Sequence, residues 1–376
     1  MPRYLKNAFI LLLLCFALGS AVAQQSVPRL ATESEVRDML IQAVDVKHST
    51  AAIIVGVITR KGRAIVSYGK FDADDPRVPD GKTVFEIGSV SKVFTALLLC
   101  DMALKGEVNL SDPVAKYLPE SVVMPTRNGK QITLLELATH HSGLPRMPTN
   151  FSPKDPGNPY IDYSPEQMFD FLSHYTLTRD PGAKYDYSNL GVGLLGYVLA
   201  LHAGTDYPTL LHTRITVPLQ MDSTAVYLTP EMKENLAPGH DAAMKKTANW
   251  DIPTLAGAGG IRSDVDDMLT FLAANMGLIK SPLQPAMKKM LSVRKFALPG
   301  TDIAMGWHIA KGQNEMVWHN GGTGGYHSFV GFEPHRKVGV VVFSNSGAFI
   351  DEIGRRTLDY QPVGPVEHRI GPDNRP

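Results

Sequence analysis

Cysteine is almost missing from this 376-residue sequence, which contains only Cys15 and Cys100. Cys15 lies in the one long apolar run, "AFILLLLCFAL", which follows Arg3 and Lys6 and precedes the small residues "AVA". This pattern is typical of a secretory signal peptide cleaved after Ala23, with a retained anchor as the alternative. The apolar core is shorter than the about 20 residues that a membrane-spanning helix needs. Cleavage would leave Cys100 alone and exclude an internal disulfide, so we expect a fold stabilised by a buried core.

Neither sign of charge dominates the sequence, which has 37 basic and 37 acidic residues. Removal of residues 1–23, with Arg3 and Lys6, would leave a small acidic excess. This balance offers no basic surface for nucleic acid or for an anionic membrane, and no later run is long and apolar enough to cross a bilayer. We therefore expect a soluble protein that is periplasmic or secreted, with no nucleic-acid or membrane partner and with a monomer as the favoured state.

Two common catalytic signatures are also absent. The sequence has no Gly-x-Ser-x-Gly nucleophile elbow of the kind used by α/β-hydrolases. It has no His-Glu-x-x-His or cysteine-rich spacing, and the adjacent His140 and His141 would face different ways, so we expect no metal site. Cys100 lies in an apolar helical run and is expected to pack in the core. Met316, Trp307 and Trp318 are also expected to be packing residues, although one or two of these three could line a cleft.

Strand patterns occur at both ends of the sequence and helical patterns lie between them. Residues 50–72 contain two β-rich runs around "RKGR", which predict an antiparallel hairpin. "YHSFVGFEP" and "KVGVVVFSNS" predict a second hairpin near the C-terminal end. Helical spacing follows Lys92 up to a stop at Gly106, dominates 164–211 and returns in "SDVDDMLTFLAANM". We predict an α/β domain interrupted by a helical one, so the two halves of the sheet would have to meet in space.

Two segments are rich in proline. Residues 145–165 contain six prolines and are flanked closely by helical patterns, which indicates a long ordered loop at the border of a functional site. The Pro-rich, polar tail from Gln361 is predicted to be disordered.

The stretch "FEIGSVSK" contains a candidate nucleophile, Ser89, three residues before Lys92. If Ser89 opens a helix, Lys92 lies one turn further along the same face, and the N–H groups of the helix start could stabilise an oxyanion. A buried lysine can lose its proton and act as a base. The structural alternative is that Ser89 only caps the helix. Ser91 is read as a spacer, and the second copy of the motif, "SVRK" from Ser292, as a chance occurrence near a helix end.

Two further motifs change the weight of these alternatives. "YSN" places Tyr187 and Asn189 two residues apart, so that both would project the same way from an extended segment, unless Tyr187 packs on the core and Asn189 caps a helix. "HNGGTGGY" places His319 beside glycines, which allow a substrate backbone to approach a strand closely, unless the segment is an ordinary turn.

Taken in this order, the three motifs resemble those of the penicillin-recognising serine hydrolases: Ser-x-x-Lys, Tyr-x-Asn and Lys/His-x-Gly. The closest resemblance is to class C β-lactamases and their relatives among D-Ala-D-Ala carboxypeptidases, D-aminopeptidases and esterases. "LATHHSGLP", "PLQMDST" and "GAGGIRSDVDDMLTFL" resemble further stretches of this family, over about Thr32 to Tyr360.

The resemblance implies a β-lactamase/transpeptidase-like fold of the α/β (α+β) class, with a central antiparallel sheet flanked by helices and an inserted all-helical domain. The expected division is a signal peptide 1–23, a catalytic domain 24–360 with an α/β part at about 30–98 and 240–360 and a helical part at about 99–239, and a tail 361–376.

The resemblance also implies roles for individual residues. Ser89 would be acylated, with Lys92 or Tyr187 as the base, and Tyr187 would pass protons to the leaving group and from the deacylating water. Asn189 would bind the substrate amide. The third motif would lie on an edge strand and supply His319, Gly321 and Gly322, with the N–H groups of Ser89 and Gly322 as the oxyanion hole. No cofactor is implied.

The third motif departs from the Lys-Thr-Gly that is usual in class C enzymes, because His319 replaces the lysine. A histidine with a pKa of about 6.5 is mostly neutral near pH 7 and offers no permanent charge to a substrate carboxylate. We rank a β-lactam first as the small-molecule substrate, a D-amino-acyl peptide second and a small ester third. A penicillin sensor that is acylated without turnover, and a structural protein that has lost catalysis, are the non-enzymatic alternatives.

Overall fold

The structure, a computed structural model, describes residues 29–312 and 314–358 of the chain. The predicted signal peptide at 1–23 and the predicted tail at 361–376 lie outside the described residues. Among the helices of the described part, none has the length and the apolar character needed to cross a membrane.

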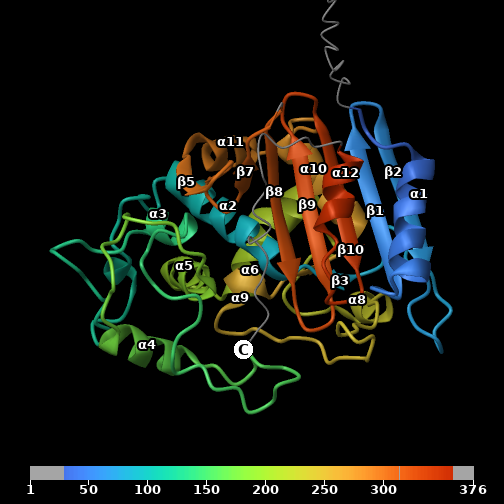
Figure 1. The fold of residues 1–376 in the computed structure, drawn as a ribbon. Coiled ribbons are helices and arrows are strands. Elements are labelled where there is room, and N and C mark those ends of the chain that lie inside the picture. The colour runs from blue at the N-terminus through green and yellow to red at the C-terminus, as the bar shows by residue number, and fades with distance from the viewer. Residues whose placement is uncertain (1–28, 313, 359–376) are drawn as a thin grey trace, which may run out of the picture.

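An antiparallel sheet of eight strands forms the centre of the protein, in the order β2-β1-β10-β9-β8-β7-β6-β5 (Figure 1). Both predicted hairpins, β1–β2 and β9–β10, are present. Strand β1 pairs with β10 through Ile53–Ile58 against Gly339–Ser344, so the two ends of the chain meet in one sheet as expected. The strands are β1 Ala52–Thr59, β2 Gly62–Gly69, β5 Lys295–Leu298, β6 Thr301–Ile303, β7 His308–Ala310, β8 Met316–Gly322, β9 His327–Glu333 and β10 Val338–Ser344.

Helices cover both faces of this sheet, because alternate side chains of its central strands point to opposite sides. In β1, Ile53 and Val55 pack in the core under α1 (Glu33–Ile41), whereas Ile54 faces the core with α2 (Ser91–Leu104) and α10 (Val265–Asn275). Helix α12 (Asp351–Thr357) contacts β9 and β10, and Figure 1 shows it in front of the sheet. The predicted mixed fold with a central antiparallel sheet and flanking helices is confirmed.

The remaining helices and turns lie mostly in the middle of the sequence. Helix α5 (Asn189–His202) is apolar on nearly all sides and is buried by its contacts with α2 and α9 (Ala256–Gly259). The predicted division into an α/β part and a helical part stays a prediction. The other helices are α3 Leu134–Ala138, α4 Pro165–His174, α6 Tyr207–Leu211, α7 Val217–Leu219, α8 Pro230–Glu234 and α11 Gln284–Ser292, with π-helical turns at Gln42–Val46 and His212–Thr216 and a 3-10 turn at Val114–Tyr117.

The residues that were expected to pack in the core do so. Cys100, Met316, Trp307 and Trp318 are all buried. Burial raises the pKa of the Cys100 thiol to about 12, which keeps it protonated and unreactive. Helix α2 ends at Leu104, two residues before the predicted stop at Gly106, whose φ of +74° is the left-handed conformation that ends helices.

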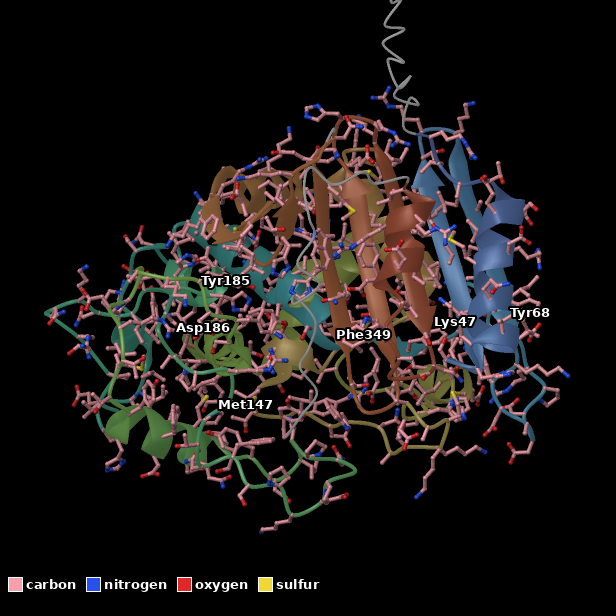
Figure 2. The ribbon with its side chains drawn as sticks, in the orientation of Figure 1. Lys47, Tyr68, Met147, Tyr185, Asp186 and Phe349 are labelled. Carbon is pink, nitrogen blue, oxygen red and sulfur yellow. The ribbon has the colours of Figure 1, made fainter. Side chains whose placement is uncertain are left out.

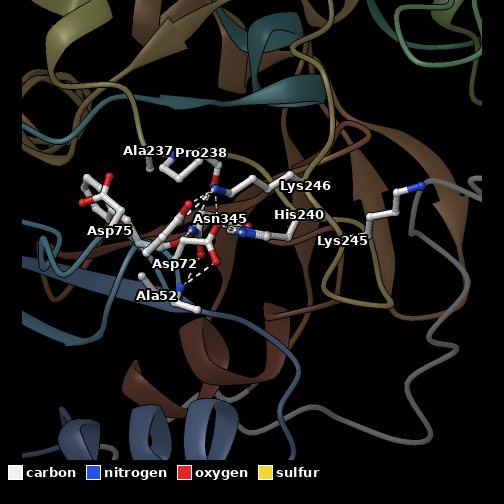
Figure 3. A network of polar contacts seen from close by, with 12 residues as sticks. Ala52, Asp72, Asp75, Ala237, Pro238, His240, Lys245, Lys246 and Asn345 are labelled. Atoms are coloured by element: carbon white, nitrogen blue, oxygen red, sulfur yellow. Dashed lines mark hydrogen bonds and ion pairs between the residues drawn. The ribbon is translucent and has the colours of Figure 1, made fainter.

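A polar network joins the loop after α8 to the end of the sheet (Figure 3). The Asn345 side-chain amide donates to the carbonyls of Phe71 and Pro238, each at 2.9 Å, and its oxygen accepts from the Ala52 N–H at 2.8 Å. Nearby, the Lys246 ammonium lies 2.7 Å from the Asp72 carboxylate. The network therefore fixes three distant segments of the chain to one another.

Candidate active site

Ser89 lies in a sharp turn that connects a short strand to α2. Strand β3 (Phe85–Glu86) pairs with β4 (Arg262–Ser263), and Gly88–Val90 then form a 3-10 turn before the helix. Gly88 has φ of +48°, and a Cβ there would lie only 2.7 Å from the Gly322 nitrogen, so only glycine fits.

The capping alternative for Ser89 is wrong. The N-cap residue of α2 is Val90, which makes no side-chain capping bond, and the Ser89 hydroxyl instead accepts a hydrogen bond from the Lys92 amine at 2.9 Å. Ser91 is more than a spacer, because its hydroxyl accepts from the Ile261 N–H at 3.1 Å and ties α2 to the segment before β4.

Lys92 is fully buried beside the candidate nucleophile. Its amine donates to the Ala258 carbonyl at 2.6 Å in addition to the Ser89 hydroxyl, and no described carboxylate pairs with it. Burial, and next the charge of Arg146, hold the pKa of Lys92 well below its ordinary 10.5. An amine in this environment is able to lose its proton and accept one from a serine.

Tyr187 lies next to this pair. Burial raises its pKa to about 12, and a hydrogen bond with the Ser89 hydroxyl opposes that shift. The Lys92 amine lies 4.8 Å from the centre of the tyrosine ring. The Ser89 hydroxyl therefore contacts both Lys92 and Tyr187. Tyr187 comes from a segment about 100 residues further along the sequence.

Asn189 does not continue an extended segment with Tyr187, contrary to the expectation from the sequence. It is the first residue of α5, and the capping residue is Ser188, whose hydroxyl accepts from the Gly191 N–H at 2.8 Å. The side-chain amide of Asn189 lies 3.7 Å from the Met147 sulfur. Serine and asparagine are equally good N-caps by residue type, and here the extended backbone of Ser188 places its side chain at the first free N–H groups of α5.

The third motif lies on β8, directly against the Ser89 turn. A Cβ on Gly321 would lie 2.1 Å from the Ile87 carbonyl oxygen and 2.8 Å from the Ser89 nitrogen, which explains why a glycine is needed there. The prediction of an edge strand is wrong, since β8 pairs with both β7 and β9. Strand β7, however, pairs only with Met316–Trp318, so 319–322 has β9 as its single strand neighbour.

His319 is buried and its ring centre lies 6.2 Å from that of Tyr187. Burial, followed by the charges of His308 and Lys92, holds the pKa of His319 well below its ordinary 6.5. One ring nitrogen, Nδ1, lies 2.6 Å from the Asn320 carbonyl oxygen, which favours a proton on that atom and leaves Nε2 as an acceptor. The residue in the lysine position of the motif is therefore a neutral group.

Sequence reasoning missed two neighbours of Tyr187. The His140 ring stacks on it with 4.4 Å between ring centres and accepts from the Ser188 N–H at 3.1 Å, whereas His141 turns to the Thr139 carbonyl. The Arg146 guanidinium carbon lies 5.2 Å from the Tyr187 ring centre. Both residues come from the loop around "HHSGLP", where a single histidine or arginine has no periodicity that could have indicated its role.

Comparison with known proteins agrees with this geometry, since the family model described as Beta-lactamase matches residues 38–359. The chain belongs to the beta-lactamase family. The D-alanyl-D-alanine-carboxypeptidase/endopeptidase AmpH of Escherichia coli (strain K12) is 28% identical over 345 residues, which cover 88% of each chain. A beta-lactamase of Pseudomonas fluorescens is 26% identical over 348 residues, covering 83% of this chain and 93% of the relative.

Solved structures share the fold of this beta-lactamase family member. A class C beta-lactamase has a TM-score of 0.75 at 23% identity, covering 87% of this chain and 95% of its own. A beta-lactamase/D-alanine carboxypeptidase from Pseudomonas syringae has a TM-score of 0.76 at 21% identity, covering 87% and 99%. The resemblance seen in the sequence is confirmed, and the family member is a serine hydrolase.

Proposed function

We propose that this protein forms an acyl-enzyme at Ser89 and releases it with water, with the strained amide of a β-lactam as the first candidate substrate. The observation that carries the proposal is the contact between a buried Lys92, which has no carboxylate partner, and the Ser89 hydroxyl. A catalytic serine needs a base within hydrogen-bond distance, and this amine provides one.

The two pKa shifts assign different roles to Lys92 and Tyr187. The pKa of Lys92 is lowered, which favours the neutral amine as acylation base, whereas the pKa of Tyr187 is about 12, which favours the protonated phenol as acid. In acylation, Lys92 takes the Ser89 proton, the serine oxygen bonds to the carbonyl carbon, and Tyr187 protonates the nitrogen as the C–N bond breaks. The Lys92 ammonium then returns a proton to Tyr187.

Deacylation runs through the same groups in reverse. Water attacks the ester carbon, its proton passes to Tyr187 and the phenol proton passes to Lys92, which finally protonates the departing Ser89 oxygen. The N–H groups of Ser89 and Gly322 would bind the oxyanion in both steps, which the close approach of Gly322 to the Ser89 turn supports. Because Tyr187 offers a route to deacylation, a turnover enzyme is favoured over a penicillin sensor.

A D-Ala-D-Ala carboxypeptidase or related D-amino-acyl peptidase is the second candidate. The similarity to AmpH over 88% of the chain favours it, and His319 in place of the lysine departs from the motif that is usual in class C enzymes. For either substrate, the sequence at 1–23 supports a periplasmic or secreted protein, which we propose to be a monomer.

Intact-protein mass spectrometry with a panel of β-lactams, D-Ala peptides and p-nitrophenyl esters tests the proposal. We expect a transient mass increase equal to the acyl group, and product release, that Ser89→Ala abolishes. The matched control is Ser292→Ala, because Ser292 belongs to the second Ser-x-x-Lys copy and is exposed at the end of α11. An adduct or product that survives Ser89→Ala would refute the proposal, as would the absence of both from the wild type.

A further inference from the structure

Arg146 is a half-buried cation without an anionic partner. Among the described residues, its guanidinium makes no ion pair and no hydrogen bond, and its one recorded contact is the face of the Tyr187 ring. Arg214 and Arg336, which are half-buried like Arg146, and Arg262, which is buried, each pair with a carboxylate. A positive charge that is held beside a catalytic residue and left without a counter-ion is suited to a negatively charged ligand.

The backbone fixes Arg146 to the start of α5. Its carbonyl accepts from the N–H groups of Asn189 at 3.0 Å and Leu190 at 3.1 Å, and the neighbouring Pro145 carbonyl accepts from the Ser188 hydroxyl at 2.6 Å. Figure 2 shows the next residue, Met147, on the helical side of the molecule together with Tyr185. The arginine is therefore held in place relative to Tyr187 and does not hang from a free loop.

The third motif leaves the task of binding a carboxylate unfilled. His319 is neutral, and beyond it the Asp351 carboxylate accepts from Asn320 at 2.7 Å and from His327 at 2.9 Å. These contacts hold Asp351 at Asn320, whose side chain points to the opposite face of β8 from His319, so among the described residues the third motif brings no cation to the Ser89 side of the strand. Lys92 is the other cation beside Tyr187, and its lowered pKa favours the uncharged form.

We propose that Arg146 is the carboxylate-binding residue of the site and selects substrates that carry a negative charge near the reacting bond. The inference rests on the proposed acyl-enzyme function. Arginine is suited to this role because its planar fork donates two parallel hydrogen bonds to a carboxylate and stays charged. In a β-lactam or a D-Ala peptide, the carbon bonded to the leaving nitrogen carries a carboxylate, and Tyr187 protonates that nitrogen. A carboxylate on the acyl side is the second source of the same chemistry.

Pairs of charged and neutral substrates test this role. Benzylpenicillin and its methyl ester, or a diacyl-Lys-D-Ala-D-Ala peptide and its amide, probe a carboxylate on the leaving group. Mono-p-nitrophenyl glutarate and p-nitrophenyl butyrate probe one on the acyl side. We expect Arg146→Gln to lower kcat/KM for one charged substrate about 10- to 100-fold more than for its neutral counterpart, with Arg146→Lys in between.

The matched control is Lys154→Gln, which removes one positive charge from an exposed position of the same loop and should leave the charged-to-neutral ratio as in the wild type. Equal losses on charged and neutral substrates would overturn the inference and indicate that Arg146 acts through Lys92 or Tyr187. Arg146→Gln activities that equal those of the wild type on every substrate would overturn it as well. A wild type without Ser89-dependent turnover of any substrate would instead refute the proposed function itself.

Discussion

Lys92 and Arg262 are two buried basic residues with very different partners. The Arg262 guanidinium lies 3.3 Å from Glu86 and 3.1 Å from Asp251, and it also donates to the carbonyls of Val226 and Trp250. Within the described part of the chain, the hydrogen-bond partners of Lys92 are the Ser89 hydroxyl and the Ala258 carbonyl, and no carboxylate is among them. Arginine stays charged and needs these acceptors, whereas an unpaired buried lysine can become neutral. The paired cation therefore stabilises the fold, and the unpaired one is available for proton transfer.

The largest effect is expected when the side chain at position 92 is made permanently charged. Lys92→Arg keeps a cation but cannot lose a proton, so we expect the acylation rate to fall about 10³-fold or more. Lys92→Met should lose as much activity, yet it should not lower the free energy of unfolding, because it replaces an unpaired buried amine with an apolar side chain. Stopped-flow acylation and urea unfolding measure the two effects. Acylation by Lys92→Arg at near wild-type rates would contradict a neutral lysine base.

The reverse pattern is expected at the paired cation. Arg262→Leu leaves Glu86 buried without its partner, and we expect it to lower the free energy of unfolding by about 3 kcal/mol. Burial already raises the pKa of Glu86, so this carboxyl would take up a proton once the arginine is gone. The double variant Glu86→Gln with Arg262→Leu should recover part of the loss. Urea unfolding of Arg262→Leu, of Glu86→Gln alone and of the double variant checks this, and additive losses in the double variant would exclude a direct pair.

Much of this arrangement could be predicted from the sequence because it depends on local spacing. Ser89 and Lys92 are one helical turn apart, and the alternating runs in 50–72 and around "HR" predicted hairpins that are present. The meeting of β1 and β10 followed from the need to complete a sheet.

The features that could not be predicted depend on contacts between distant segments or on very short elements. Strands β6 and β7 have three residues each, too few to show an alternating pattern, so the interior position of β8 was missed. The capping role of Ser188 depends on how the chain enters α5, and Asn189 is an equally plausible cap by residue type. The role proposed for Arg146 depends on its position beside Tyr187, which is 41 residues away in the sequence and could not be predicted from local spacing.

The smallest expected effect concerns a pair at the surface, Asp72 and Lys246 in Figure 3. The hydrogen bond from Lys246, followed by that from the Ala73 N–H, lowers the pKa of Asp72 from 3.8 to about 2. A carboxyl whose pKa is lower in the folded state contributes stability above its unfolded pKa and loses that contribution as the pH falls toward 2. We expect Asp72→Asn to lower Tm by about 1 to 2 °C at pH 7, because Lys246 is half-exposed and solvent screens the pair. The difference from the wild type should shrink below pH 4.

Asp74→Asn is the control for this prediction, since Asp74 pairs with the same lysine but is far more exposed. An equal effect of both variants on Tm would show that burial of the carboxylate does not matter here.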